Sequence, residues 1–348
     1  MKNINPKGFF DEEFRLEKLS KQKDPLVKLL QMIEWEEFRP ILERIFKKEM
    51  KGKGGRTPYD YVMMFKTLIL QRYYNLSDDQ IEYQILDRLS FMRFLSLTLS
   101  DKVPDSKTVW NFREQLTKAG KVEAMFDKFN EVLAEKGLLA EEGTMIDASF
   151  VEVPRQRNSK KENKQIKEGN IPESWEKNPN KLARKDVDAR WTKKNEVNYY
   201  GYKDHVKADT KSKLIQSYEV TDASVHDSQV VEDLLDKSDE GKELYADSAY
   251  SGEPVAKTLK TKKVKNKIHE KGYKNKPLTE QQIQNNKKKS KTRARVEHIF
   301  GFIENNMNGS FIHSIGKVRA ISIIGLMNLT YNMFRYIQLC EIHGISMS

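Results

Sequence analysis

Apolar residues recur at helical spacing through much of the first 140 residues. The clearest example follows Thr57-Pro58, a hydroxyl residue and proline in the pattern of a helix start. The apolar positions behind it are Tyr61, Met64, Phe65, Leu68 and Ile69. Because residues three and four apart share one face of a helix, this spacing predicts a helix that buries one side.

Two more helix starts follow at short intervals. Ser77 and Gln80 have the spacing of a capping box, and either Asp105 or Ser106 caps a third helix after Pro104. Short helices with tight connections predict an all-helical N-terminal domain over residues 1–140. Such bundles often bind DNA through one helix, and a scaffold or dimerisation role is an equal alternative.

The pattern changes to β-structure near residue 143. Residues 143–151 form a β-prone run, and residues 199–206 and 214–220 predict two strands joined by a turn at 208–212. The later segments alternate: a helix at 230–235, a strand at 243–246, a helix at about 252–261, a strand at about 264–268 and a long helix around 290–305. This order predicts a mixed α/β domain over residues 141–340.

Residues 155–196 interrupt the α/β pattern. They are polar, basic and nearly without periodicity, which predicts an inserted loop or mobile arm. The segment contains Trp175 and Trp191. These two side chains either stack on nucleic-acid bases or cover the core as the arm folds back.

The net charge of +11 is unevenly distributed along the chain. Residues 155–194 carry 13 Lys and Arg against 6 Asp and Glu, and residues 257–295 carry 15 against 2. The rest of the chain is therefore acidic. Two basic segments on an otherwise acidic chain indicate a polyanionic partner. Neither segment has an apolar stripe suited to lipid, which favours nucleic acid over a membrane.

Other features limit the class of protein. The single cysteine, Cys340, excludes an internal disulfide framework and multi-cysteine zinc sites. Residues 1–14 lack the apolar core of a signal peptide. Polar residues interrupt the apolar run 321–339, which predicts a packing helix rather than a membrane span. We expect a cytoplasmic protein associated with the nucleoid.

Three acidic residues are candidates for catalysis. Asp147 interrupts an apolar strand, where an uncompensated charge is unfavourable. Asp247 ends another strand, and functional side chains collect at strand ends of open α/β sheets. Glu297 lies on a helix with an apolar face. Carboxylate oxygens suit Mg²⁺ or Mn²⁺ rather than zinc, and two such ions about 3.5–4 Å apart can promote phosphodiester chemistry.

Each acid alone has a simpler explanation. An aspartate at a strand end is commonly a turn former or cap, and Arg293 is available as an ion-pair partner four residues before Glu297. The string His226-Asp227-Ser228 is better explained as a helix start than as an acid–base site. The combination of three acids with two basic segments is what favours a metal-dependent DNA site.

The chain resembles the DDE transposases of bacterial insertion sequences, in the group typified by insertion sequence five. Residues 144–153, 245–252 and 293–297 resemble the three signature regions of that family. The string Tyr-Ala-Asp-Ser-Ala-Tyr-Ser-Gly, followed about 50 residues later by Arg-x-x-x-Glu, is specific. Residues 57–116 resemble the family's helical N-terminal domain and residues 201–205 a strand of its catalytic core. The resemblance covers roughly residues 55–340.

The resemblance implies an RNase H-like mixed sheet flanked by helices. In it, Asp147, Asp247 and Glu297 would be the catalytic residues and the ligands of Mg²⁺, with Mn²⁺ as a substitute. The enzyme would hydrolyse DNA at the element's end, and the freed 3′ hydroxyl would attack a target strand. Arg293 would contact phosphate near the cut. The implied partners are double-stranded DNA, of the terminal repeats and the target, and a second copy of the chain in a DNA-bound homodimer.

Basic residues around Arg293 are expected to contact DNA phosphates, with a merely solvated face as the alternative. They are Lys287, Lys288, Lys289, Lys291 and Arg295. Two positions depart from the family signature, because Ser290 and Glu304 stand where it has tyrosine and lysine. Lys289, Lys291 or Lys317 are the candidates to replace that lysine.

Two other functions fit the same residues. A transposase-derived regulator would bind DNA without catalysis, although the three acids would then have no chemical reason to remain. A nuclease on the same fold would hydrolyse DNA without strand transfer, and the sequence does not separate it from a transposase.

Overall fold

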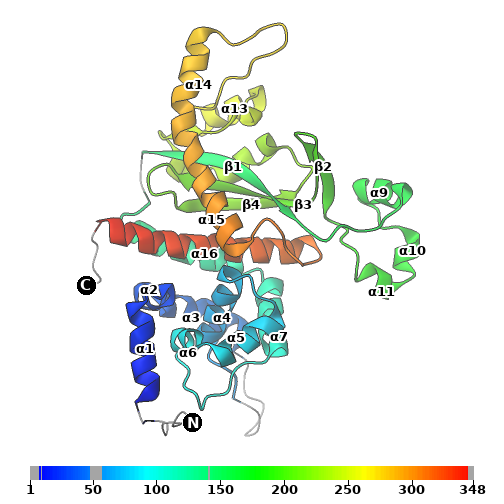
Figure 1. Cartoon of the computed structure of the whole chain (residues 1–348). Coiled ribbons are helices and arrows are strands. Elements are labelled where there is room, and N and C mark those ends of the chain that lie inside the picture. Colours follow the sequence, from blue (N-terminus) through cyan, green and yellow to red (C-terminus); the bar gives the residue numbers. More distant parts are fainter. Residues whose placement is uncertain (1–7, 9, 48–56, 140–141, 344–348) are drawn as a thin grey trace, which may run out of the picture. The chain divides into compact units, whose positions relative to one another are not determined.

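The computed structural model describes residue 8 and residues 10–47, 57–139 and 142–343 (Figure 1). Most of the stretch considered for a signal peptide, residues 1–7 and 9, lies outside the described residues. The chain divides into two compact units, one of residues 1–119 with 336–348 and one of residues 120–335. The domains at 1–140 and 141–340, with their roles, remain predictions.

The described part of the first unit is helical. Its helices before residue 120 are α1 (Asp11–Lys21), α2 (Pro25–Met32), η1 (Trp35–Phe38), α3 (Arg39–Phe46), α4 (Tyr61–Tyr73), α5 (Asp78–Asp87), α6 (Leu89–Leu95) and α7 (Ser106–Lys118). Aromatic rings fill its core: Trp35 packs edge-on against Phe65 and Phe94, with ring centroids 6.0 and 5.5 Å apart.

Two of the three predicted helix starts in this unit are confirmed. The capping box of Ser77 and Gln80 opens α5, and the Asp105 side chain caps α7. The prediction of a start at Thr57-Pro58 is wrong. Helix α4 begins at Tyr61, because the Asp60 carboxylate accepts a hydrogen bond from the Met63 amide (2.9 Å) and serves as the cap.

A six-stranded mixed sheet lies at the centre of the second unit (Figure 1). Its strands are β1 (Gly143–Glu152), β2 (Arg190–Lys194), β3 (Val197–Asp209), β4 (Ile215–Asp222), β5 (Glu243–Tyr245) and β6 (Lys265–Asn266). The main order is β4-β3-β1-β5-β6, with β2 on the first residues of β3. β3 is antiparallel to β1 and β4, whereas β5 and β6 run parallel to β1. The predicted mixed α/β sheet flanked by helices is confirmed.

Helices and short helical turns complete this unit. Outside the basic insertion they are α8 (Val122–Glu135), η2 (Asp227–Val230), α12 (Val231–Leu234), η3 (Lys237–Asp239), η4 (Ser248–Tyr250), α13 (Glu253–Thr261), α14 (Glu280–Arg293), η5 (Ala294–Val296), α15 (Glu297–Met307) and α16 (Lys317–His343), the last continuing into the first unit. Ile146 of β1 packs with apolar residues of α12 and α13 in one core cluster. Across the described ranges, no helix is long and apolar enough to span a membrane.

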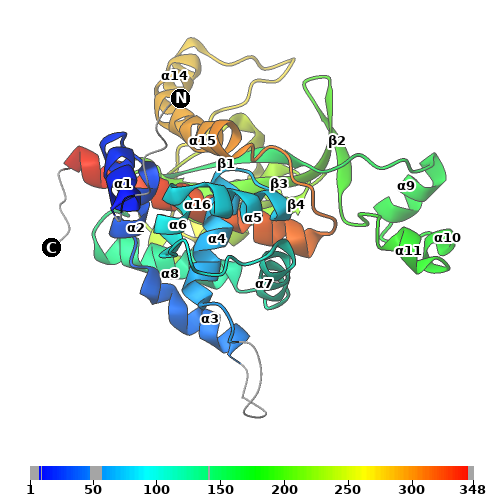
Figure 2. The same cartoon turned by 60° about the horizontal axis from the view of Figure 1, so that its bottom comes forward.

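The basic insertion contains more structure than the expected loop. It forms α9 (Lys160–Lys167), α10 (Glu173–Glu176), α11 (Pro179–Leu182) and strand β2, and its three helices lie together beyond β2 (Figure 2). The Trp175 ring is buried and its Nε1 donates to Glu162 Oε1 (2.7 Å). Trp175 therefore belongs to the core of this segment. Trp191 is 42% exposed. Of these two tryptophans, only Trp191 is accessible for stacking on a nucleic-acid base.

The long helix expected around 290–305 is two helices. Helix α14 begins ten residues earlier, at a capping box of Thr279 and Gln282, and ends at Arg293. The chain then makes one 3₁₀ turn, Ala294–Val296, before α15 begins at Glu297. The sequence pattern missed this arrangement because α14 has no buried residue and so no apolar face to detect.

Burial of Asp204 predicts a pH-dependent stability. Asp204 Oδ1, on β3, accepts a hydrogen bond from Asn328 Nδ2 (3.1 Å), and burial raises the pKa of Asp204 from 3.8 to about 7. Between these pH values the folded protein holds a proton that the unfolded chain has lost, so stability falls as pH rises through this window. We expect Asp204→Asn to unfold at a higher temperature than wild type at pH 8, by a difference that shrinks towards pH 4. Thermal unfolding of both proteins from pH 4 to 8 tests this, and a pH-independent difference contradicts it.

Candidate active site

The sheet brings two of the three candidate acids side by side. β1 and β5 run parallel, and their register pairs Met145 with Tyr245. Asp147 and Asp247 each follow these paired residues by two positions. Both aspartates therefore lie at the same level of neighbouring parallel strands, where functional side chains collect in such sheets.

Asp147 is a buried carboxylate with a cation against it. Its Oδ1 accepts a hydrogen bond from the Ala148 amide (2.9 Å), and its Oδ2 forms an ion pair with Arg293 Nη2. Burial raises the pKa of Asp147, and the negative charge of Asp247 raises it further, whereas the Arg293 guanidinium lowers it. The two aspartates are thus close enough to repel each other, which makes a cation at this position favourable.

Asp247 has a local structural role as well. Its Oδ1 accepts a hydrogen bond from the Ala249 amide (2.7 Å) and caps the short helix η4. The simple explanation of a strand-end aspartate as a cap is therefore correct for one of its oxygens. A cap and a metal ligand are compatible roles, because a carboxylate has two oxygens and several lone pairs.

Arg293 connects Asp147 to Glu297. While its Nη2 pairs with Asp147, its Nη1 donates to Glu297 Oε1 (3.0 Å). The Glu297 side chain is 65% exposed at the start of α15. Among the described residues, no three acidic, histidine or cysteine side chains lie close enough together to hold a metal ion. In this arrangement the Arg293 guanidinium, rather than a metal ion, lies between Asp147 and Glu297.

The donor set fits a divalent cation. All three side chains offer carboxylate oxygens, the ligands that Mg²⁺ and Mn²⁺ prefer. A positive group already lies between Asp147 and Glu297. Replacing this guanidinium by a metal ion would exchange one cation for another, so the buried Asp147 would never be left without a positive partner.

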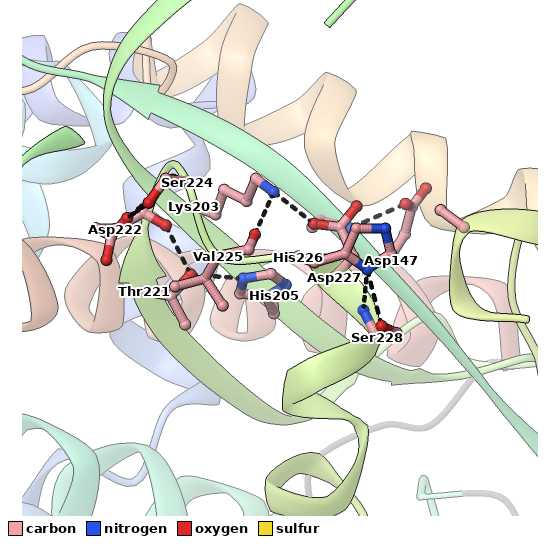
Figure 3. A network of polar contacts seen from close by, with 12 residues as sticks. Asp147, Lys203, His205, Thr221, Asp222, Ser224, Val225, His226, Asp227 and Ser228 are labelled. Carbon is pink, nitrogen blue, oxygen red and sulfur yellow. Dashed lines mark hydrogen bonds and ion pairs between the residues drawn. The ribbon is translucent and has the colours of Figure 1, made fainter. Parts of the chain in front are cut away.

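A second charged pair belongs to the same region of the sheet (Figure 3). Lys203 Nζ, from β3, donates to the Val225 carbonyl and to Asp227 Oδ1, each at 2.7 Å. Asp227 begins η2, which is capped by the His226 ring through the Ser228 amide (3.3 Å). The interpretation of this string as a helix start is thus supported, with His226 as the cap.

Two further side chains near the aspartates were not among the candidates named from the sequence, although Tyr250 lies within the signature string at residues 245–252. Tyr250 is buried, and its burial raises its pKa well above the ordinary value; the charges of Asp147, Asp227 and Asp247 add to the effect. His269 lies near Asp247 and Arg293, and burial lowers the pKa of His269. Its Nε2 is 3.3 Å from the hydroxyl of Ser290.

The basic residues before Glu297 differ in their surroundings. Lys287, Lys288 and Lys291 are exposed on α14. Lys289 donates to the Ile268 carbonyl (2.9 Å), and Arg295 donates to the Thr210 carbonyl (2.8 Å). Lys289 and Arg295 therefore also stabilise the local fold, whereas the three exposed lysines extend into solvent, where a phosphate can reach them.

Comparison with known families identifies the class of enzyme. A family model described as Transposase DDE domain matches residues 139–333, and one described as Transposase domain (DUF772) matches residues 14–115. The first match covers more than half of the chain, so the chain belongs to the DDE transposases, DNA transposases that cleave DNA and transfer strands in a reaction dependent on a divalent metal, typically Mg²⁺.

Two solved transposase structures are similar over most of the chain. The piggyBac transposase, in a synaptic complex with hairpin DNA, is 13% identical, with 93% of this chain and 77% of that chain covered and a TM-score of 0.45. A pre-cleavage Mos1 transpososome is 10% identical, with 90% and 87% covered and a TM-score of 0.20. Because both TM-scores are below 0.5, the family assignment rests on the family models.

Proposed function

We propose that the chain is the transposase of an insertion sequence of the group typified by insertion sequence five. It cuts DNA at the ends of its own element and joins the freed ends to a target. The observation that carries this proposal is the parallel pairing of β1 and β5, which places Asp147, on β1, beside Asp247, two residues after β5, while Arg293 links Asp147 to Glu297.

In this proposal, Asp147, Asp247 and Glu297 hold Mg²⁺, with Mn²⁺ as a substitute. The bound ions supply activation of the attacking oxygen and stabilisation of the leaving oxygen. The chain's residues position these groups. β1 and β5 fix the two aspartates, and the burial of Asp147 strengthens its attraction to a cation because water screens the charges less. Arg293 offers a planar fork of donors that suits a DNA phosphate.

Double-stranded DNA is the proposed partner, as terminal repeats and as target. The exposed lysines of α14 precede the proposed site directly in the chain and would bind phosphates beside the cut. Two ends of an element must be handled together, which supports a homodimer on DNA. In a bacterial cell, this DNA would place the protein at the nucleoid.

Neutralising the exposed lysines of α14 should weaken DNA binding on all sequences alike. For Lys287→Gln/Lys288→Gln/Lys291→Gln we expect the slope of log affinity against log salt to fall by about 0.9 for each phosphate that is no longer neutralised. Fluorescence anisotropy with two unrelated duplexes over a salt series measures this. Lys237→Gln, which removes an exposed lysine from η3, is the control and should bind as wild type. Weaker binding of one duplex only would indicate base recognition instead.

A strand-transfer assay separates the proposed function from its alternatives. The substrate is a labelled DNA with the element's own ends, incubated with target DNA and Mg²⁺. Cleaved ends joined to the target support the transposase. Cleavage without joining supports a nuclease on the same fold. Binding without cleavage, with either Mg²⁺ or Mn²⁺, supports a regulator that has lost catalysis.

A further inference from the structure

The hydroxyl of Tyr250 is a buried polar group without a hydrogen-bond partner anywhere in the described part of the chain. Tyr250 ends η4, the turn that Asp247 caps, and its ring packs in the core cluster with Ile146 of β1. Its ring is fully buried. A buried donor without a partner lowers the stability of a fold, so a hydroxyl retained here calls for a partner in another state of the protein.

The surroundings of this hydroxyl identify the kind of partner. Three carboxylates, those of Asp147, Asp227 and Asp247, act on Tyr250 through their charge, and Asp147 has the largest effect. Burial and these charges hold the pKa of Tyr250 well above its ordinary value. The phenol is therefore protonated at neutral pH and has a hydrogen to donate, and carboxylate oxygens are strong acceptors.

Of the three carboxylates, Asp147 is the one whose side-chain donor, Arg293, has a proposed second partner in DNA phosphate. Asp227 is held by Lys203 (2.7 Å) and Asp247 is exposed to solvent more than Asp147. Asp147 accepts from the Ala148 amide and from Arg293. If Arg293 moves to a DNA phosphate, Asp147 loses this side-chain donor while it remains buried.

We propose that Tyr250 is a positioning residue of the active centre, whose hydroxyl donates to the Asp147 carboxylate when Arg293 leaves it. The hydrogen bond would hold Asp147 in the orientation that binds a metal ion, just as outer partners orient ligands in other metal sites. This inference rests on the proposed function, because it assumes that Arg293 binds DNA and that Asp147 binds metal.

Removing Arg293 allows a test without DNA. In full-length Arg293→Gln, Asp147 is free of the guanidinium, and Mn²⁺ affinity can be measured by electron paramagnetic resonance of the free ion. Adding Tyr250→Phe should weaken Mn²⁺ binding about tenfold. Tyr218→Phe is a matched control, because the Tyr218 hydroxyl is also buried without a partner in the described residues, but on β4 with different acidic neighbours. It should leave Mn²⁺ affinity unchanged.

Thermal unfolding without metal separates positioning from a structural role. In the otherwise unmodified chain, Tyr250→Phe and Tyr218→Phe should each unfold at or above the wild-type temperature, because each removes an unpartnered hydroxyl. In the Arg293→Gln background, Tyr250→Phe should lower the unfolding temperature by about 2–4 °C, because the hydroxyl now donates to Asp147. If Arg293→Gln does not fold, Mn²⁺ is titrated into the chain with Arg293 in place and into its two Phe variants. Tyr250→Phe should then bind Mn²⁺ more weakly than the unmodified chain, and Tyr218→Phe should bind it equally well.

Two results would overturn the inference: equal Mn²⁺ affinity with and without the Tyr250 hydroxyl, or a lower unfolding temperature of Tyr250→Phe in the unmodified chain. Asp247→Asn in the same background distinguishes this failure from failure of the proposed function. If Mn²⁺ binding depends on Asp247 and not on Tyr250, only the positioning role is wrong. If Mn²⁺ binding is indifferent to Asp247, the proposed metal centre itself is wrong.

Discussion

Asp247→Asn is expected to lower the rate of Mg²⁺-dependent DNA cleavage by at least ~10³-fold and to leave DNA binding close to wild type. The reason is that a carboxamide is a poor ligand for Mg²⁺, and a metal ion at the reacting phosphate contributes several kcal/mol to the transition state. Asparagine keeps a side-chain oxygen that can accept the Ala249 amide and so preserve the cap of η4. Cleavage rates from gels, with affinities from anisotropy, measure the two effects separately.

Asp222→Asn is the matched control for this substitution. Asp222 also ends a strand, β4, and its Oδ1 accepts the amide of the residue two positions later (2.9 Å). It lies outside the proposed triad, so its variant should cleave DNA at nearly the wild-type rate. Asp147→Asn and Glu297→Gln should behave like Asp247→Asn. Retained cleavage in any one of the three variants would remove that residue from the triad.

The largest expected effect on stability is that of Lys207→Met. Lys207 Nζ, on β3, donates to Asp239 Oδ2 (2.7 Å) and Asp236 Oδ2 (2.8 Å). The side chains of Lys207 and Asp239 are each 1% exposed. Removing the lysine charge leaves a buried carboxylate without its cation, which lowers the free energy of unfolding by about 3–5 kcal/mol. Urea unfolding followed by circular dichroism measures this decrease.

An exposed ion pair provides the comparison for Lys207. Lys263 Nζ pairs with Glu240 Oε1 at a similar distance, 2.7 Å, but the two side chains are 72% and 56% exposed. Because water screens such pairs, Lys263→Met should lower the free energy of unfolding far less than Lys207→Met does. If Lys207→Met were no more destabilising than Lys263→Met, burial would not be what makes the Lys207 pair important.

Helices and strands could be predicted from the sequence where apolar periodicity and helix-capping residues indicated the same element. The capping box of Ser77 opens α5 as expected, and the alternation of strands and helices after residue 143 yields the mixed sheet. The start of α4 was misplaced because Asp60, three residues after Thr57, offers a better-placed cap. Helix α14 and the insertion lacked apolar periodicity, so neither could be recognised from its pattern, although Trp175 gives the insertion a buried ring.

The candidate site was only partly predictable. Asp147 and Asp247 could be found because each charge follows or interrupts an apolar strand, and the parallel register of β1 and β5 then places them together. The link from Arg293 to Asp147 joins residues 146 positions apart, a contact that local spacing cannot reveal. Local spacing does not reveal the ion pair of Lys203 with Asp227 either. Nor does it reveal the surroundings of Tyr250, whose acidic neighbours come from three separate segments.

The proposed metal centre can be located directly in a crystal structure of the protein bound to DNA and Mn²⁺, with the ions identified by anomalous scattering. We expect Mn²⁺ coordinated by oxygens of Asp147, Asp247 and Glu297, with the Arg293 guanidinium moved from Asp147 to a DNA phosphate. Mn²⁺ bound elsewhere on the protein, with Arg293 still between Asp147 and Glu297, would contradict it.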